Sequence, residues 1–155
     1  MTENMLSMRV RGVTLTVPDE QPVVVLESER GSVAVRVGAY EAGAIIMQLE
    51  ELSTPRPLTH QLLAELLSER GIRVTRAEIY GVYGRDEDGF LARIVYGKGL
   101  RKRARDVRPS DAIALALAFK APLLAHESLV RDDLMPGLVQ EAQARAYWRP
   151  AGAAV

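Results

Sequence analysis

Two Arg-Pro pairs that open expected helices mark the places where this chain can bind a negatively charged group. One begins at Arg56 and the other at Arg108, and proline is favoured in the first turn of a helix. A helix N-terminus offers unpaired N–H groups and a partial positive charge, and an adjacent arginine adds a forked donor. We therefore expect two phosphate clamps, unless each arginine simply pairs with a nearby acid. The side chains expected to contact phosphate are Arg56, Thr59, Arg108 and Ser110.

His60 lies in the first of these motifs and is the candidate for moving a proton. The unperturbed pKa of histidine lies near neutrality, which suits general acid or base catalysis. The positive end of a helix would lower this pKa and favour the neutral, proton-accepting imidazole. The alternative is a hydrogen-bonded structural histidine, and His126 has a weaker functional case still.

Glu41 and Asp111 are the best pair of carboxylates in the chain. Each is followed by alanine near the start of an expected helix. Two converging carboxylates can hold Mg²⁺ or Mn²⁺, with bound water as the nucleophile, so both acids join His60 as catalytic candidates. The alternative needs no metal, because acids in a first turn also complement the helix dipole.

The basic run before the second motif forms a third candidate. In a strand, Arg101, Arg103 and Arg105 share one face and form a row that can follow a phosphate backbone. The alternative is an edge strand whose charges prevent aggregation. Residues 71–110 hold 10 basic and 5 acidic side chains, a net charge of +5, although the whole chain is neutral.

Composition limits the class of protein. The chain has 155 residues, 48% hydrophobic and 26% charged, which is typical of one globular domain. The absence of cysteine excludes disulfides, thiolate nucleophiles and cysteine-bound metals. The longest uncharged apolar run, residues 112–119, is too short to span a bilayer, and no signal stretch opens the chain. We expect a cytoplasmic protein with no membrane partner.

Hydrophobic patterning predicts that three strands and a helix occur twice. A helix between the two units is expected to bury a leucine face, and the helix after Pro109 is apolar on every side and is expected to be buried all round. Gly71 is expected to end the middle helix in a left-handed conformation. The expected strands are residues 5–17, 22–29, 32–37, 72–83, 90–96, 100–106 and 122–126; the leucine face is Leu62, Leu63, Leu66 and Leu67.

This pattern predicts an α+β fold, a mostly antiparallel sheet with packed helices, built from a duplicated strand-strand-strand-helix unit. The duplication would place Glu41 and Asp111 at equivalent positions. We expect one domain over residues 1–130 and a C-terminal helical extension over 131–155 that packs on it. Exposed edge strands make a homodimer a further expectation, and Tyr147 and Trp148 would suit an interface.

Four segments of the chain resemble the bifunctional nuclease family. They are PVVVLESERG (22–31), VGAYEAGAIIMQLE (37–50), STPRPLTHQLLAELL (53–67) and VRPSDAIALALAFKAPLL (107–124), and the resemblance covers about residues 8–130. The resemblance implies a compact domain with a duplicated strand–helix plan and hydrolysis of DNA and RNA phosphodiesters. The family's polar signature falls on Glu41, Arg56, Thr59, His60, Arg108, Ser110 and Asp111.

One departure from the family pattern concerns the site. The family usually has aspartate after the histidine of its Thr-His pair, and Gln61 stands there in this chain. The resemblance makes a nuclease that acts on DNA and RNA with a divalent ion the first hypothesis, whereas Gln61 fits the alternative. The alternative is a non-catalytic regulatory module that binds nucleic acid or a nucleotide through the same clamps. A structural, dimer-forming partner of another protein is the third.

Overall fold

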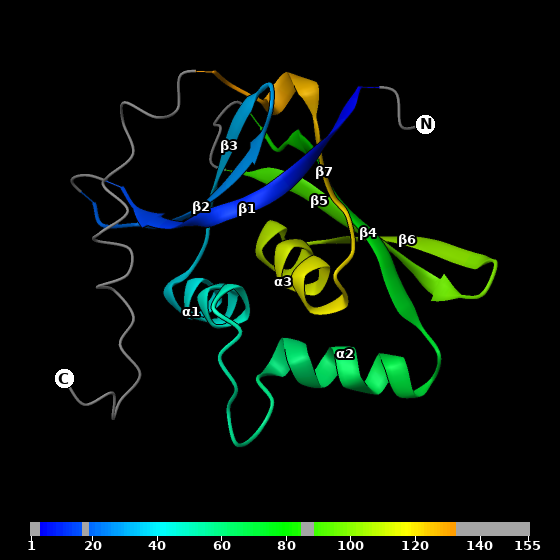
Figure 1. Ribbon diagram of the computed structural model, residues 1–155. Helices are drawn as coiled ribbons and strands as arrows, with labels where there is room; N and C mark the ends of the chain where they lie inside the picture. The colour runs from blue at the N-terminus through cyan, green and yellow to red at the C-terminus, as the bar shows by residue number, and fades with distance from the viewer. Residues whose placement is uncertain (1–3, 17–18, 85–88, 133–155) are drawn as a thin grey trace.

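One twisted seven-stranded sheet forms the framework of the chain. The computed structural model describes residues 4–16, 19–84 and 89–132 (Figure 1). The strand order is β3-β2-β1-β7-β4-β5-β6, and all neighbouring strands are antiparallel except β4 and β7. The predicted α+β class with a mostly antiparallel sheet is confirmed. The strands are β1 (Met5–Leu15), β2 (Pro22–Ser28), β3 (Gly31–Arg36), β4 (Arg73–Val82), β5 (Phe90–Lys98), β6 (Arg101–Val107) and β7 (Leu123–His126).

The two predicted strand-strand-strand-helix units lie on either side of β7 in the sheet. Strands β1, β2 and β3 lie in order on one side of β7, and β4, β5 and β6 lie in order on the other. Helix α1 (Ala39–Leu49) follows the first set, and helix α3 (Pro109–Phe119) follows the second. Helix α2 (Thr59–Glu69) connects the two units. Each unit therefore delivers one helix N-terminus directly from the end of its third strand.

The three helices lie on one face of the sheet, and α3 occupies the middle of this layer (Figure 1). The side chains of Ala112 and Ile113 are fully buried, and so are Leu26, Ile45 and Ile79, which belong to the same core. The prediction of a helix buried nearly all round is confirmed for most of α3, whose remaining buried residues are Ser110, Ala114, Leu115, Ala116 and Phe119. Arg108 and Asp111 thus stand where this buried helix begins.

The prediction that α2 buries a face of four leucines is wrong for three of them. Leu62, Leu63 and Leu66 are 44%, 44% and 51% exposed, whereas Ala64 is buried and Leu67 packs against the core. Helix α2 contacts α3, and the side of α2 that carries the buried Ala64 and the partly buried Leu67 is the one turned to the core. Gly71 ends α2 with a φ of 71°, as expected.

Several sequence predictions fall outside the described residues. The C-terminal helical extension expected over residues 131–155, with Tyr147 and Trp148, is among them, because the described residues end at 132. Within the described ranges, no helix is long and apolar enough to cross a membrane.

The turn between β5 and β6 depends on a close backbone approach at Gly97. Gly97 pairs with Lys102, and a Cβ at this position would overlap the carbonyl oxygen of Arg101. We expect Gly97→Ala to lower the free energy of unfolding by about 1–3 kcal/mol, because the hairpin must open to accommodate the methyl group. Urea unfolding followed by circular dichroism measures the change.

Gly12→Ala is the matched control for this substitution. Gly12 also lies in a strand, and a Cβ there would meet no atom within 4 Å. Its unfolding free energy should stay within about 0.5 kcal/mol of the wild type. Equal effects of the two substitutions would show that the approach at Gly97 is not a constraint.

Candidate active site

Arg108 is the centre of the candidate site. It is the N-cap residue of α3, and Pro109 fixes the first helical turn behind it. Because Asp111 lies three residues further along the chain, its carboxylate returns to the guanidinium and accepts two hydrogen bonds. Nε of Arg108 lies 2.7 Å from Oδ2 and Nη2 lies 2.9 Å from Oδ1. The arginine is therefore held by a two-pronged contact within its own helix start.

Glu41, from the first strand-strand-strand-helix unit, contacts the same arginine. It is the third residue of α1, as Asp111 is of α3. Its Oε1 lies 3.3 Å from Nη1 of Arg108, although the two residues are 67 positions apart. The predicted convergence of Glu41 and Asp111 is thus observed, with the guanidinium between them. The acids raise the pKa of Arg108, chiefly through the hydrogen bond to Asp111, so the cation stays charged.

His60 lies in the first turn of α2 and borders this pair. Burial lowers its pKa from 6.5, and the nearby Asp111 carboxylate opposes the shift without reversing it. His60 is therefore neutral at neutral pH, as predicted, with burial as the main cause. Its Nε2 is buried and has no hydrogen-bond partner among the described residues. An unsatisfied buried polar atom costs about 1–3 kcal/mol, and a ligand that supplied a partner would recover that energy.

The guanidinium keeps donors that the acids do not use. Arginine has about five N–H groups, and the three hydrogen bonds to Asp111 and Glu41 leave about two of them free. The Arg108 side chain is 66% exposed, so these donors face solvent. An oriented arginine with outward N–H groups can bind a phosphate oxygen or stabilise charge that develops on it.

Among the described residues, the remaining members of the two Arg-Pro motifs make no side-chain hydrogen bond or ion pair with Arg108. Thr59 and Arg56 are exposed, and the Arg56 side chain makes no hydrogen bond or ion pair within the described part of the chain. Ser110 is buried at 8% exposure in the first turn of α3. The position where the family has aspartate serves as a cap, because Oε1 of Gln61 accepts a hydrogen bond from the Leu58 N–H at 3.0 Å. Gln61 thus fixes the start of α2 and the placement of His60.

Arg101, Arg103 and Arg105 lie on β6, which is the edge strand of the sheet and is exposed along nearly its whole length. This run is therefore a charged edge strand, as the alternative interpretation predicted. An edge position leaves the three side chains accessible to a partner, so it does not exclude the predicted contact with phosphate.

Two cavities of the described chain have linings that do not include Arg108. One, of about 750 Å³, opens between the C-terminal ends of α1 and α3 and the side of α2. Its lining includes Gln61 and Arg73, and it includes none of Glu41, His60 and Asp111. This cavity is therefore separate from the candidate site, where the Arg108 side chain is exposed.

Sequence reasoning missed one polar cluster, which lies on the opposite face of the sheet. Glu78 on β4 is 1% exposed, and Arg76 and Arg93 each donate to one of its carboxylate oxygens. Burial favours a raised pKa for Glu78, but these hydrogen bonds outweigh it and hold the pKa below its ordinary value. Arg93 also lies 4.9 Å from the ring centre of Tyr80. The alternation of charged residues along β4 was the available signal, and the cluster joins β4 to β5.

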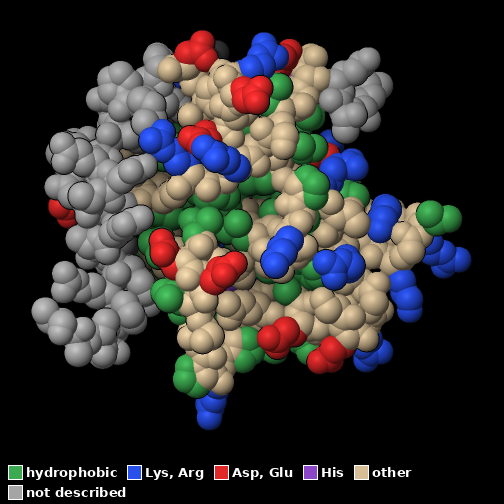
Figure 2. All heavy atoms as spheres, in the orientation of Figure 1, with side chains coloured by type: hydrophobic (Ala, Val, Ile, Leu, Met, Phe, Trp, Pro, Cys, Tyr) green, Lys and Arg blue, Asp and Glu red, His purple; other side chains and the backbone are tan. Residues whose placement is uncertain are grey.

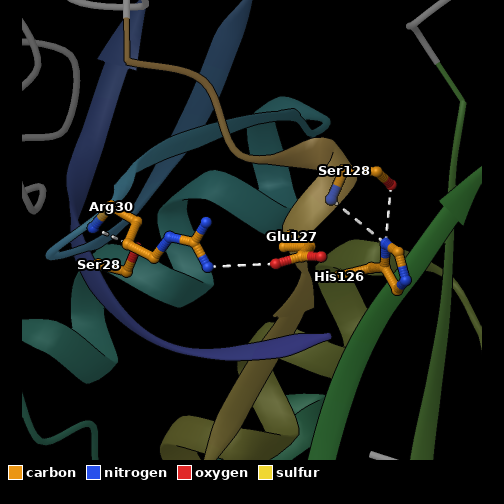
Figure 3. A network of polar contacts seen from close by, with 5 residues as sticks. All are labelled: Ser28, Arg30, His126, Glu127 and Ser128. Atoms are coloured by element: carbon orange, nitrogen blue, oxygen red, sulfur yellow. Dashed lines mark hydrogen bonds and ion pairs between the residues drawn. The ribbon is translucent and has the colours of Figure 1, made fainter. Parts of the chain in front are cut away.

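His126 has a structural role, in agreement with its weaker functional case. Figure 3 shows its ring turned toward Ser128, whose Oγ lies 2.7 Å from Nδ1. The ring also accepts a hydrogen bond from the Ser128 N–H and so caps the 3₁₀ turn η1 (Glu127–Leu129). The neighbouring Glu127 pairs with Arg30, and Ser28 accepts from the Arg30 N–H (Figure 3). These contacts attach the turn between β2 and β3 to the end of β7.

Comparison with known proteins agrees with the resemblance that the four sequence segments indicated. A family model described as the bifunctional nuclease domain matches residues 24–136. The uncharacterized proteins MT1877 and Rv1829, from two strains of Mycobacterium tuberculosis, are each 30% identical over 125 residues, which covers 79% of this chain and 73% of theirs. Bifunctional nuclease 2 of Oryza sativa subsp. japonica is 26% identical over 119 residues, which covers 73% of this chain and 36% of the rice protein.

The burial of His60 predicts how stability depends on pH. Because burial lowers the pKa of His60, the unfolded chain binds a proton more readily than the folded chain does. The free energy of unfolding should therefore fall as pH decreases through 6.5 toward the lower folded value. We expect His60→Asn to flatten this slope in urea titrations between about pH 7.5 and 5.5.

His126→Asn is the control, because it removes the other histidine, whose ring is held by hydrogen bonds at the 3₁₀ turn. A slope that is unchanged in His60→Asn would contradict the assignment of the shift to His60.

Proposed function

The chain belongs to the bifunctional nuclease domain family, and from this premise we propose that it hydrolyses phosphodiester bonds of DNA and RNA. The observation that carries the proposal is the Arg108 guanidinium, which two carboxylates orient and which lies beside a neutral histidine. A phosphodiester presents non-bridging oxygens to the arginine and needs a base to activate the nucleophile.

Arg108 binds the scissile phosphate in this proposal. Its free N–H groups donate to the non-bridging oxygens, and the positive charge stabilises the additional negative charge of the transition state. Asp111 and Glu41 act as positioning residues, because they hold the guanidinium in one orientation before the substrate arrives.

His60 acts as the general base. A ring nitrogen takes a proton from the attacking water, the water oxygen forms a bond to phosphorus, and the ester P–O bond breaks. The leaving oxygen takes a proton from solvent. A lowered pKa keeps His60 unprotonated and ready to accept at neutral pH.

The predicted divalent ion does not fit the acids as they are held. Carboxylates are suitable ligands for Mg²⁺ or Mn²⁺, but the guanidinium of Arg108 contacts both Glu41 and Asp111. The described ranges contain no cluster of three or more histidine, aspartate or glutamate side chains that could hold a metal ion. An ion would have to displace Arg108, and no step is assigned to it. The metal requirement stays a prediction, as do the cytoplasmic location and the homodimer.

A non-catalytic module is the second candidate, and the same pairing favours it. The carboxylates expected to activate a metal-bound water are engaged with Arg108. A site of this kind can retain a phosphate without cleaving it. Binding of nucleic acid without turnover would support this candidate over the nuclease.

Replacement of the base tests the nuclease proposal. We expect His60→Gln to lower the cleavage rate of a labelled oligonucleotide by about 10²- to 10⁴-fold, because the nucleophile loses its proton acceptor. His126→Gln is the matched control and should cleave at the wild-type rate. Equal rates for wild type and His60→Gln, or no cleavage above a mock-purified sample, would contradict the proposal.

Substitution of Arg108 tests the metal prediction by binding rather than by activity. Arg108→Gln removes the cation between Glu41 and Asp111, so we expect it to bind Mn²⁺ more tightly than the wild type in calorimetric titration. The double variant Arg108→Gln with Asp111→Asn is the control and should lose this gain. Tight Mn²⁺ binding by the wild type that Asp111→Asn abolishes would show that the ion displaces Arg108.

A further inference from the structure

Four cations of the β5–β6 hairpin form a continuous row on one face of the sheet. Lys98 pairs with Arg101 and Tyr96 pairs with Arg103. Residues directly opposite one another in antiparallel strands place their side chains on the same face, and alternate residues share it. The basic row is therefore Lys98, Arg101, Arg103 and Arg105, on the face that also carries the helices. Figure 2 shows Lys and Arg side chains gathered over this hairpin.

The end of α2 adjoins the row and adds to its charge. The side chain of Lys98 lies so near Gly71 that a Cβ there would meet the Lys98 Cε at 3.3 Å. Arg70, the C-cap residue of α2, directly precedes this glycine and is exposed. Two acids lie next to these cations along the chain, Glu69 and Asp106, and within the described ranges neither makes an ion pair with the row. Asp106 pairs with Arg93 in the sheet register and accepts a hydrogen bond from Tyr80, so it lies on the opposite face.

The row differs from the other described arginine clusters because no acid neutralises it. Arg30 pairs with Glu127, and the arginines at 76 and 93 pair with Glu78. Within the described ranges, no side chain of the basic row makes an ion pair, and the one polar contact that Arg105 makes is with the phenol of Tyr96. A row of unpaired cations on an accessible edge attracts a polyanion.

The geometry of the row leads to the candidate site. Alternate residues of a strand are about 6.8 Å apart, so the three arginines can contact successive phosphates of one nucleic-acid strand. Strand β6 ends at Val107 and the next residue is Arg108, so the Cα atoms of Arg105 and Arg108 lie within about 11 Å of one another. A backbone held on the row thus needs only one or two nucleotides to reach the Arg108 guanidinium.

We propose that the basic row is a docking site for a single-stranded nucleic acid and that it delivers the strand to Arg108. This inference rests on the proposed function for the identity of the polyanion. The chain turns from β6 into α3 at Arg108, and a flexible single strand can follow that turn. A duplex has a persistence length of about 150 base pairs, so bending it over a short site carries a deformation cost that a single strand avoids.

Binding measured without cleavage tests the docking site. In the full chain carrying His60→Gln, fluorescence anisotropy of a labelled single-stranded oligonucleotide in EDTA reports affinity against salt. We expect Arg101→Gln with Arg103→Gln to weaken binding at least about tenfold at low salt and to reduce the salt slope by about 1.4, or about 0.7 for each lost phosphate contact. The duplex of the same sequence should bind more weakly than the single strand.

Arg9→Gln with Arg30→Gln is the control, because it removes the same charge from arginines that pair with Glu27 and Glu127. It should bind as the parent does, and both variants should keep the parent's melting temperature. Unchanged affinity in the Arg101 and Arg103 variant, tighter binding of the duplex, or stronger competition by polyglutamate than by single-stranded DNA would overturn the proposal. Retained row-dependent binding with no cleavage by the wild-type chain would refute the nuclease and leave the docking site standing.

Discussion

The burial of α3 in the middle of the helical layer is the constraint on which the site depends. This helix contacts α1, α2 and the sheet strands β4 and β5, and its small residues, such as Ala112 and Ala116, permit that close approach. A helix so enclosed has a fixed direction and a fixed starting point. Its first turn therefore presents Arg108 and Asp111 at one place, and the first turns of α1 and α2 are brought to it by the same packing.

The chemistry of that place follows from the balance of charge at three helix starts. Helix N-termini are electropositive and favour carboxylates, which Glu41 and Asp111 supply. Two adjacent carboxylates repel one another unless a cation joins them, and Arg108 does so while it keeps donors facing solvent. The two strand-strand-strand-helix units thus share one site through a single guanidinium, and a neutral histidine from the connecting helix lies beside it.

Much of the fold could be predicted because its signals are local. Alternation marked the strands, proline marked the start of α3, and Gly71 marked the end of α2. The leucine face of α2 was predicted wrongly because the packed fold buries Ala64 and leaves Leu62, Leu63 and Leu66 exposed, and the packing partner of a helix face is not a local signal. The pairing of Arg108 with Asp111 was open to prediction from their spacing, whereas the contact with Glu41 spans 67 positions and depends on the packed fold. Glu78 escaped notice because a charged residue in a strand is usually solvent-facing, and its partner Arg93 comes from another strand.

The central position of β7 has a consequence for the nascent chain. This strand joins the two halves by pairing with residues 5–8 of β1 and 77–79 of β4, yet it is the last of the seven strands to leave the ribosome. Until residue 126 is available, the inner edges of β1 and β4 have no partner, and unpaired edges invite association with other chains. Closure of the sheet then joins segments nearly the whole described length apart, which slows folding. The sheet is thus completed at its middle, by a short strand that is made after the other six.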